Sequence, residues 1–94
     1  MPDRDASDKA LSARQFLKYP KFMLDQRKEG DVMVECTVSL TGATKDCVVL
    51  QANSPEFGQA ALAYCIQAIY MPAVQNGVPV EQRRSWKLTF RLGS

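Results

Sequence analysis

The sequence predicts an α+β fold in which a three-stranded, antiparallel-type sheet carries two helices on one face. Residues 31–40 and 84–92 alternate apolar and polar side chains, as strands with one buried face do. Residues 57–69 place apolar side chains at helical spacing between these strands. With 94 residues, 46% of them hydrophobic, the chain has room for one small domain.

The composition argues against several classes of function. The chain has no histidine, so a histidine base or metal ligand is excluded, and no histidine activates Cys65. The acids Glu35, Asp46, Glu56 and Glu81 show no paired spacing, so we expect no enzyme, metal or cofactor. A net charge of +2 is too small to indicate nucleic-acid binding. No stretch approaches the ~20 apolar residues of a membrane-spanning helix.

The first element of the domain is expected to be a short helix. Residues 1–18 are polar with a sparse apolar pattern, which predicts a tail or the end of a linker, and 19–94 are expected to form the domain. Pro20 favours a helix start and Gly30 a helix stop. The intervening helix, 21–29, is expected to bury Phe22 and Met23.

An antiparallel hairpin follows. The strand over 31–40 directs one set of side chains to a buried face: Val32, Val34, Cys36 and Val38. Thr41-Gly42 supplies the turn, because glycine accepts positive φ without steric cost. The second strand, 44–51, places Cys47 and Val49 on one face.

A longer helix and a final strand complete the fold. Ser54-Pro55 starts the helix, and Pro72 ends it near Met71. Its apolar stripe comprises Phe57, Ala61, Leu62, Cys65, Ala68 and Ile69. After a turn at Asn76-Gly77, the last strand runs from about Arg84 to Leu92. Its core-facing side chains are Trp86, Leu88, Phe90 and Leu92.

The last strand is expected to pair beside the first, giving the spatial order 2-1-3. It then lies at an edge of the sheet, and the sequence offers no later strand to cover it. An open edge is a row of unpaired backbone donors and acceptors that is ready to take another strand.

These patterns resemble the C-terminal domain of the TonB family of energy transducers over roughly Lys18 to Leu92. Six pieces carry the resemblance by their order and spacing: Tyr19-Pro20; Glu29-Gly30-x-Val32-x-Val34; Val38 followed by Gly42; Phe57-x-x-Ala60-Ala61-Leu62; Tyr70-Met71-Pro72-Ala73 with Asn76-Gly77-x-Pro79-Val80; and Leu88-x-Phe90-x-Leu92. The family fold is the one predicted above.

The resemblance implies a periplasmic domain of a Gram-negative bacterium. In the family, a Pro-rich spacer joins this domain to one inner-membrane helix, which couples to a proton-driven ExbB–ExbD type motor. The domain binds the TonB box, a short segment of an outer-membrane transporter. Energy transmitted in this way drives the uptake of siderophores, cobalamin or other nutrients.

The resemblance also implies partner-binding residues, because the box adds as a strand to the edge of the last strand. The expected residues there are Arg84, Ser85, Trp86, Lys87, Leu88, Thr89, Phe90, Arg91 and Leu92, with Gln15, Tyr19 and Pro20 outside the strand. Positive charge from Arg83, Arg84, Lys87 and Arg91 either steers an acidic partner or forms a solvated face that limits aggregation. Trp86, in phase with Leu88 and Phe90, is either a core residue or an exposed contact.

The sequence departs from the family at two positions. Phe16 stands where family members often carry glutamine, three residues before the Tyr-Pro, with Gln15 beside it. Phe22 stands where a basic residue is common, with Lys21 adjacent. The resemblance therefore does not decide whether residues outside the edge strand contact the transporter. Tyr19 is either such a contact or a core anchor.

The cysteines fit a TonB-like subgroup with a paired cysteine in the hairpin. Cys36 and Cys47 lie opposite each other if the turn is a two-residue loop, whereas a three-residue loop turns one of them away. The disulfide Cys36–Cys47 with a buried Cys65 thiol is favoured over three separate buried cysteines.

A second hypothesis assigns the same fold to a protein with a different binding partner. A periplasmic cell-wall-binding or scaffold module would use the basic edge and Trp86 against glycan or acidic protein, since a fold does not fix a function. The open edge also allows edge-to-edge homodimers of the isolated domain.

Overall fold

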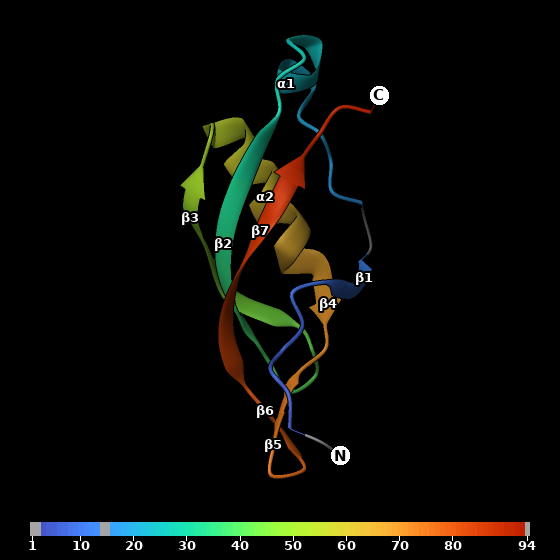
Figure 1. The fold of residues 1–94 in the computed structure, drawn as a ribbon, viewed down its shortest axis with the longest axis vertical. Helices are drawn as coiled ribbons and strands as arrows, with labels where there is room; N and C mark the ends of the chain where they lie inside the picture. Colours follow the sequence, from blue (N-terminus) through green and yellow to red (C-terminus); the bar gives the residue numbers. More distant parts are fainter. Residues whose placement is uncertain (1–2, 14–15, 94) are drawn as a thin grey trace.

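The computed structural model describes residues 3–13 and 16–93 and is elongated, with extents of 48 × 23 × 19 Å (Figure 1). The elements in chain order are β1 (Ala10–Ala13), α1 (Lys21–Asp25), β2 (Gly30–Val38), β3 (Thr44–Ala52), α2 (Pro55–Gln67), β4 (Ala68–Tyr70), β5 (Ala73–Gln75), β6 (Val78–Val80) and β7 (Gln82–Phe90). Helix α2 lies behind the sheet of the long strands, and α1 lies at one end of the long axis (Figure 1).

The main sheet has the order β3-β2-β7, which confirms the predicted order 2-1-3. Both neighbours of β2 run antiparallel to it, and its register with β7 is unbroken from Gly30↔Phe90 to Val38↔Gln82. The predicted inward residues of β2 are fully buried: Val32, Val34, Cys36 and Val38. Trp86 and Phe90 of β7 are buried on the same face, so the period-2 patterns identify the core correctly.

Helix α2 begins where the sequence predicts and ends earlier. Ser54 accepts a hydrogen bond from the N–H of Phe57, and Pro55 occupies the first turn. The helix ends at Gln67 rather than near Met71, because Ala68 turns to extended geometry and Tyr70 donates its N–H to the Gly42 carbonyl. Ala68 and Ile69 therefore belong to β4, not to the helical stripe.

Helix α1 is shorter than the predicted 21–29. It ends at Asp25, and the chain reverses through Arg27, whose φ is 54°. Met23 is buried as expected, but the expectation for Phe22 is wrong: it is 61% exposed, because so short a helix contacts the domain with one side only. Gly30 begins β2 at a position where a Cβ atom would lie 2.7 Å from the Phe57 ring.

The last strand is displaced by two residues from its predicted bounds of 84–92. It begins at Gln82, directly after the β5–β6 hairpin, whose turn is the predicted Asn76-Gly77 with positive φ at both residues. Leu92 lies beyond the strand and is half-buried.

The described part of the leading segment packs along the domain instead of leaving it as a tail. Arg4 exchanges backbone hydrogen bonds with Val74, Ser7 donates to the Met71 carbonyl, and β1 pairs with β4. Ala6 is 1% exposed. The sequence did not predict this docking, because backbone hydrogen bonds and one small buried residue, Ala6, make most of the contacts and leave no apolar pattern.

The hairpin reaches the predicted disulfide by a different local geometry. A hydrogen bond from Ser39 N–H to the Ala43 carbonyl (2.8 Å) closes a three-residue loop, Leu40 to Gly42, which by itself would place Asp46 opposite Cys36. A β-bulge at Asp46, whose φ is 53°, shifts the register by one residue. Cys36 and Cys47 are thereby brought together, bonded, with Cα atoms 4.1 Å apart, while Cys65 is a buried free thiol.

Reduction of the Cys36–Cys47 disulfide should lower the free energy of unfolding by about 3 kcal/mol, because the cross-link closes a short loop in the unfolded chain. Urea titrations with and without reductant measure the change. Alkylation in denaturant should label one thiol without reductant and three after reduction; three labels without reductant would contradict the pairing.

Stability should fall in alkali, because burial raises the pKa of both Cys65 and Tyr70. The folded state holds the protons of both groups more tightly than the unfolded chain, which loses them first as the pH rises. The free energy of unfolding is therefore highest below about pH 9 and falls at higher pH. Urea unfolding at a series of pH values tests this, and Tyr70→Phe should show a smaller fall. An equal fall in both proteins would refute the assignment to Tyr70.

Candidate functional site

The outer edge of β7 presents backbone groups that the sheet leaves unpaired. Asp31 bonds through both its N–H and its carbonyl to Asn53, on the β3 side of β2. Since alternate residues of an antiparallel strand face opposite neighbours, the even-numbered residues of β2 bond to β7. In this register they pair with even-numbered residues of β7, such as Trp86 and Leu88. The N–H and carbonyl groups of Ser85, Lys87 and Thr89 therefore point to the free edge.

No other strand covers this edge within the residues that the structure describes. β7 has β2 as its single strand neighbour there. The leading segment rises on the side of β7 away from β2 (Figure 1), but its described backbone-to-backbone hydrogen bonds go to β4, Met71 and Val74. The edge is flanked rather than paired.

The side chains of β7 divide into two sets. Trp86 and Phe90 are 4% and 2% exposed, and Trp86 packs on Tyr70 with ring centroids 4.6 Å apart. Of the two alternatives for Trp86, a core residue or an exposed contact, the structure shows the core residue. Ser85, Lys87 and Thr89 are exposed on the opposite face. The backbone groups of Trp86 and Phe90 point to β2, so the free edge belongs to the alternate residues Ser85, Lys87 and Thr89.

The cations near the edge differ in how they are neutralised. Arg83 is 2.7 Å from Glu35 and also donates to Thr37, and Arg91 is 3.2 Å from Asp31. Arg84 lies 3.7 Å from Asp5. Lys87 has no salt-bridge partner among the residues 3–13 and 16–93.

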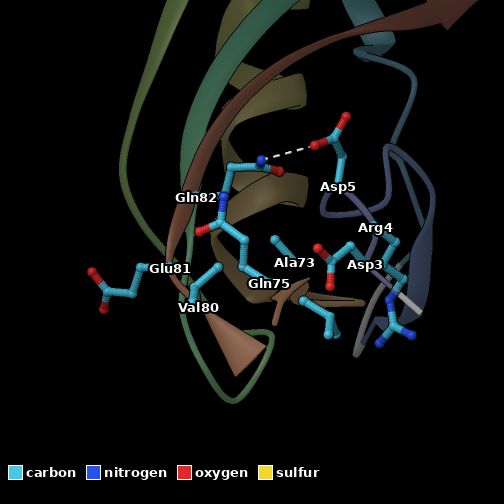
Figure 2. A pocket seen from close by; sticks show the side chains of 9 residues that line it. Asp3, Arg4, Asp5, Ala73, Gln75, Val80, Glu81 and Gln82 are labelled. Carbon is cyan, nitrogen blue, oxygen red and sulfur yellow. Dashed lines mark hydrogen bonds between the residues drawn. The ribbon is translucent and has the colours of Figure 1, made fainter. Parts of the chain in front are cut away.

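A clasp of side chains ties the leading segment to the start of β7. Ala6 donates its N–H to Gln82 Oε1 (2.7 Å), and its carbonyl accepts from Arg84 (2.7 Å). Gln82 also donates to Asp5 (3.0 Å), the bond drawn in Figure 2. Both backbone groups of Ala6 are therefore bonded to side chains of β7, and the clasp holds Ala6 against the helix side of the strand between Gln82 and Arg84.

Tyr19 and Pro20 hold the other end of the domain together. The Tyr19 ring makes edge contacts with Phe57 and Phe90, each at 5.7 Å, and its hydroxyl donates to the Lys28 carbonyl. Burial, with the charge of Glu29, raises the pKa of Tyr19. Pro20 accepts the first helical bond, from Leu24. Tyr19 is thus a core anchor in this structure.

The remaining expected residues are placed as follows. Leu92 donates its N–H to Glu29 (2.7 Å), which fixes the chain after β7. Gln15 lies outside the described residues. Phe16, beside it, is 93% exposed.

A polar hollow of about 560 Å³ lies below the clasp, between residues 3–5 and the β5–β6 hairpin (Figure 2). Asp3, Asp5 and Glu81 contribute to its lining together with Arg4. Within the described part of the chain no group of acids and cysteines is arranged to hold a metal ion. No helix in that part is long and apolar enough to cross a membrane.

Sequence reasoning did not find the clasp or the docking of β1. The clasp joins residues 76 positions apart through side-chain bonds to a backbone, which leave no periodic signal in the sequence. The signal that was available is the pair of polar residues, Gln82 and Arg84, at inward positions of an otherwise apolar strand face.

Comparisons with known proteins agree with the overall fold. The family model for the Gram-negative bacterial TonB protein C-terminal matches residues 15–92. The solution NMR structure of the TonB C-terminal domain of Pseudomonas aeruginosa is similar in fold, with a TM-score of 0.70 and 22% identity, over 98% of this chain and 91% of that chain. A search of curated proteins finds no match.

Removal of the clasp should release the leading segment. In Gln82→Ala the Ala6 N–H loses its acceptor, so its hydrogen exchange should become about 2- to 10-fold faster. NMR-detected exchange measures this. Gln75→Ala, an exposed glutamine of the same hollow, is the matched control. Unchanged exchange at Ala6, or an equal effect of both variants, would contradict the assignment.

Proposed function

We propose, on the premise that this chain belongs to the family of Gram-negative TonB C-terminal domains, that it captures the TonB box of an outer-membrane transporter by strand addition to β7. The coarser part follows from the family: the domain has a TonB-type role and is a periplasmic interaction domain for outer-membrane transporters. The strand addition is the step that the geometry of β7 supports.

The open backbone of Ser85, Lys87 and Thr89 carries the proposal. These residues project donors and acceptors toward solvent from a strand whose other edge is locked to β2. An extended peptide laid against them completes the ladder. Because backbone groups supply this attachment, partners with different sequences can be held.

The same geometry suits a domain that transmits force. β7 is held along its length by β2 and at its ends by the clasp and by Glu29. Each net hydrogen bond to a guest strand contributes about 0.5–1.5 kcal/mol. A pull along the strands loads several of these bonds together, so the guest resists removal better than one bond would allow.

The proposal also includes the membrane anchor, the spacer and the motor that would act on this domain. An inner-membrane anchor and a Pro-rich spacer link the domain to an ExbB–ExbD type motor, and proton-motive energy drives siderophore or other nutrient uptake. Residues 1–18 form the end of that linker, with 19–94 as the domain on which its described part docks. When isolated, two domains pair through their β7 edges.

The cell-wall or scaffold alternative receives no support from the structure. Its aromatic contact, Trp86, is 4% exposed, so the indole ring has no face available for a glycan. The basic side chains Arg83 and Arg91 are already paired with acids of β2.

A proline at Thr89 should abolish capture while preserving the fold. The Thr89 N–H points to the free edge, so Thr89→Pro removes no ladder bond to β2. It removes one donor for the guest and puts a ring in the guest's path, and we expect at least about tenfold weaker peptide binding. Titration of the ¹⁵N-labelled domain with a transporter box peptide measures affinity, and its spectrum verifies folding.

Thr89→Val is the matched control, since it keeps the N–H and the β-branched shape and should bind as the parent does. Undiminished binding by a folded Thr89→Pro protein would show that the peptide does not add to this edge.

A further inference from the structure

We infer that β7 selects its guest by side chain as well as by backbone: a hollow beside Leu88 receives one aliphatic side chain of the added strand, and Lys87 receives an acidic neighbour. This inference rests on the proposed strand addition. It assigns a specificity pocket to residues of β1, α2 and β7.

The hollow has a volume of about 280 Å³ and lies on the helix side of the free edge. It is lined by Ala10, Ser12 and Ala13 of β1, by Phe16 and Leu17, by Tyr64 of α2 and by Leu88 of β7. Leu88, Leu17, Tyr64 and Ala10 are partly buried and pack against the main core. The docked leading segment therefore builds one wall, and β7 builds the other.

Strand geometry directs a guest side chain into this hollow. Neighbouring residues on adjacent strands project to the same face, with Cβ atoms about 4.5–5.5 Å apart. The guest residue beside Leu88 therefore points to the helix side, where the hollow lies. An aliphatic side chain there covers Leu88 and the alanines of β1, whereas a charged one is desolvated among apolar groups.

The clasp places this position within the open stretch of the edge. Ala6 occupies the helix side of the strand between Gln82 and Arg84. A guest thus begins beyond Arg84, and Leu88 lies between Ser85 and the chain fixed at Leu92. One aliphatic residue near the middle of the guest sets its register on β7.

Charge distinguishes the opposite face of the same guest. Residues next to the aliphatic one point away from the helices, toward the exposed side chains of Lys87 and Thr89. Arg83 and Arg91 on that face have Glu35 and Asp31 as partners, whereas Lys87 has no salt bridge in the described residues. The class of partner is therefore an extended segment with an aliphatic residue followed or preceded by an acidic one.

Blocked octapeptides test the assignment. They alternate threonine and aspartate around one variable position, occupied by glycine, alanine, valine or leucine. NMR titration of the ¹⁵N-labelled domain should give about tenfold tighter binding for leucine than for alanine, from the added methyl and methylene groups that leave water. Nuclear Overhauser contacts should join the leucine methyls to those of Ala13 and Leu88.

A substitution that fills the hollow should remove the preference and leave capture intact. Ala13 is exposed, so Ala13→Trp is compatible with folding, and its leucine and alanine peptides should bind within about twofold of each other. Ala63→Trp, at an exposed position of α2 that does not line this hollow, should keep the preference. Lys87→Gln should reduce the advantage of aspartate over asparagine beside the variable residue.

The failures of the two proposals are distinguishable. Equal binding of all four peptides with shifts confined to 85–92, or a preference that survives in Ala13→Trp, would overturn the pocket and leave strand capture standing. An absence of shifts at 85–92 with every peptide would overturn both.

Discussion

Each residue of the central strand β2 can direct its backbone N–H and carbonyl to only one of the two neighbouring strands, and the accessible edge of the domain depends on this division. The backbone groups of its odd-numbered residues bond toward β3, as the bonds of Asp31 show, and those of its even-numbered residues bond to β7. The disulfide agrees with this division, because a Cα separation of 4.1 Å between Cys36 and Cys47 is typical of a non-hydrogen-bonded pair. β7 is consequently saturated on one side and open on the other.

The rest of the fold limits which part of that open side is usable. The clasp around Ala6 covers the first residues of β7, and Glu29 holds the chain after its end. The stacked pair Phe57 and Phe90, with centroids 4.6 Å apart, fixes the far end of β7 from the core side. A rigid edge costs little ordering entropy on binding, since only the guest has to lose conformational freedom.

The parts of the fold that the sequence predicts are those with a periodic signal. Alternation identified β2 and the core face of β7, and Ser54-Pro55 identified the start of α2. The disulfide was expected from family resemblance and a two-residue loop; it forms across a three-residue loop, because the bulge at Asp46 restores the register. The positive φ of Asp46 is a local backbone conformation imposed by the strand pairing, and no pattern of residue types in the sequence predicted it.

What the sequence did not reveal depends on contacts between distant segments. The end of α2 is set by the bond from Tyr70 to Gly42, where a Cβ would meet the Tyr70 carbonyl at 2.2 Å. The docking of residues 3–13 depends on backbone bonds to β4 and Val74. The open edge itself was predictable from strand order, whereas the hollow beside Leu88 was not, because most of its lining residues come from a segment expected to be a tail.

Amide hydrogen exchange along β7 tests the central claim most directly. In the free monomer the amides of Trp86, Leu88 and Phe90 should be protected by β2, and those of Ser85, Lys87 and Thr89 should exchange rapidly. A bound transporter segment should protect the second set and leave the first unchanged. Protection of Ser85, Lys87 and Thr89 in the free monomer, or their continued rapid exchange in the complex, would contradict the account.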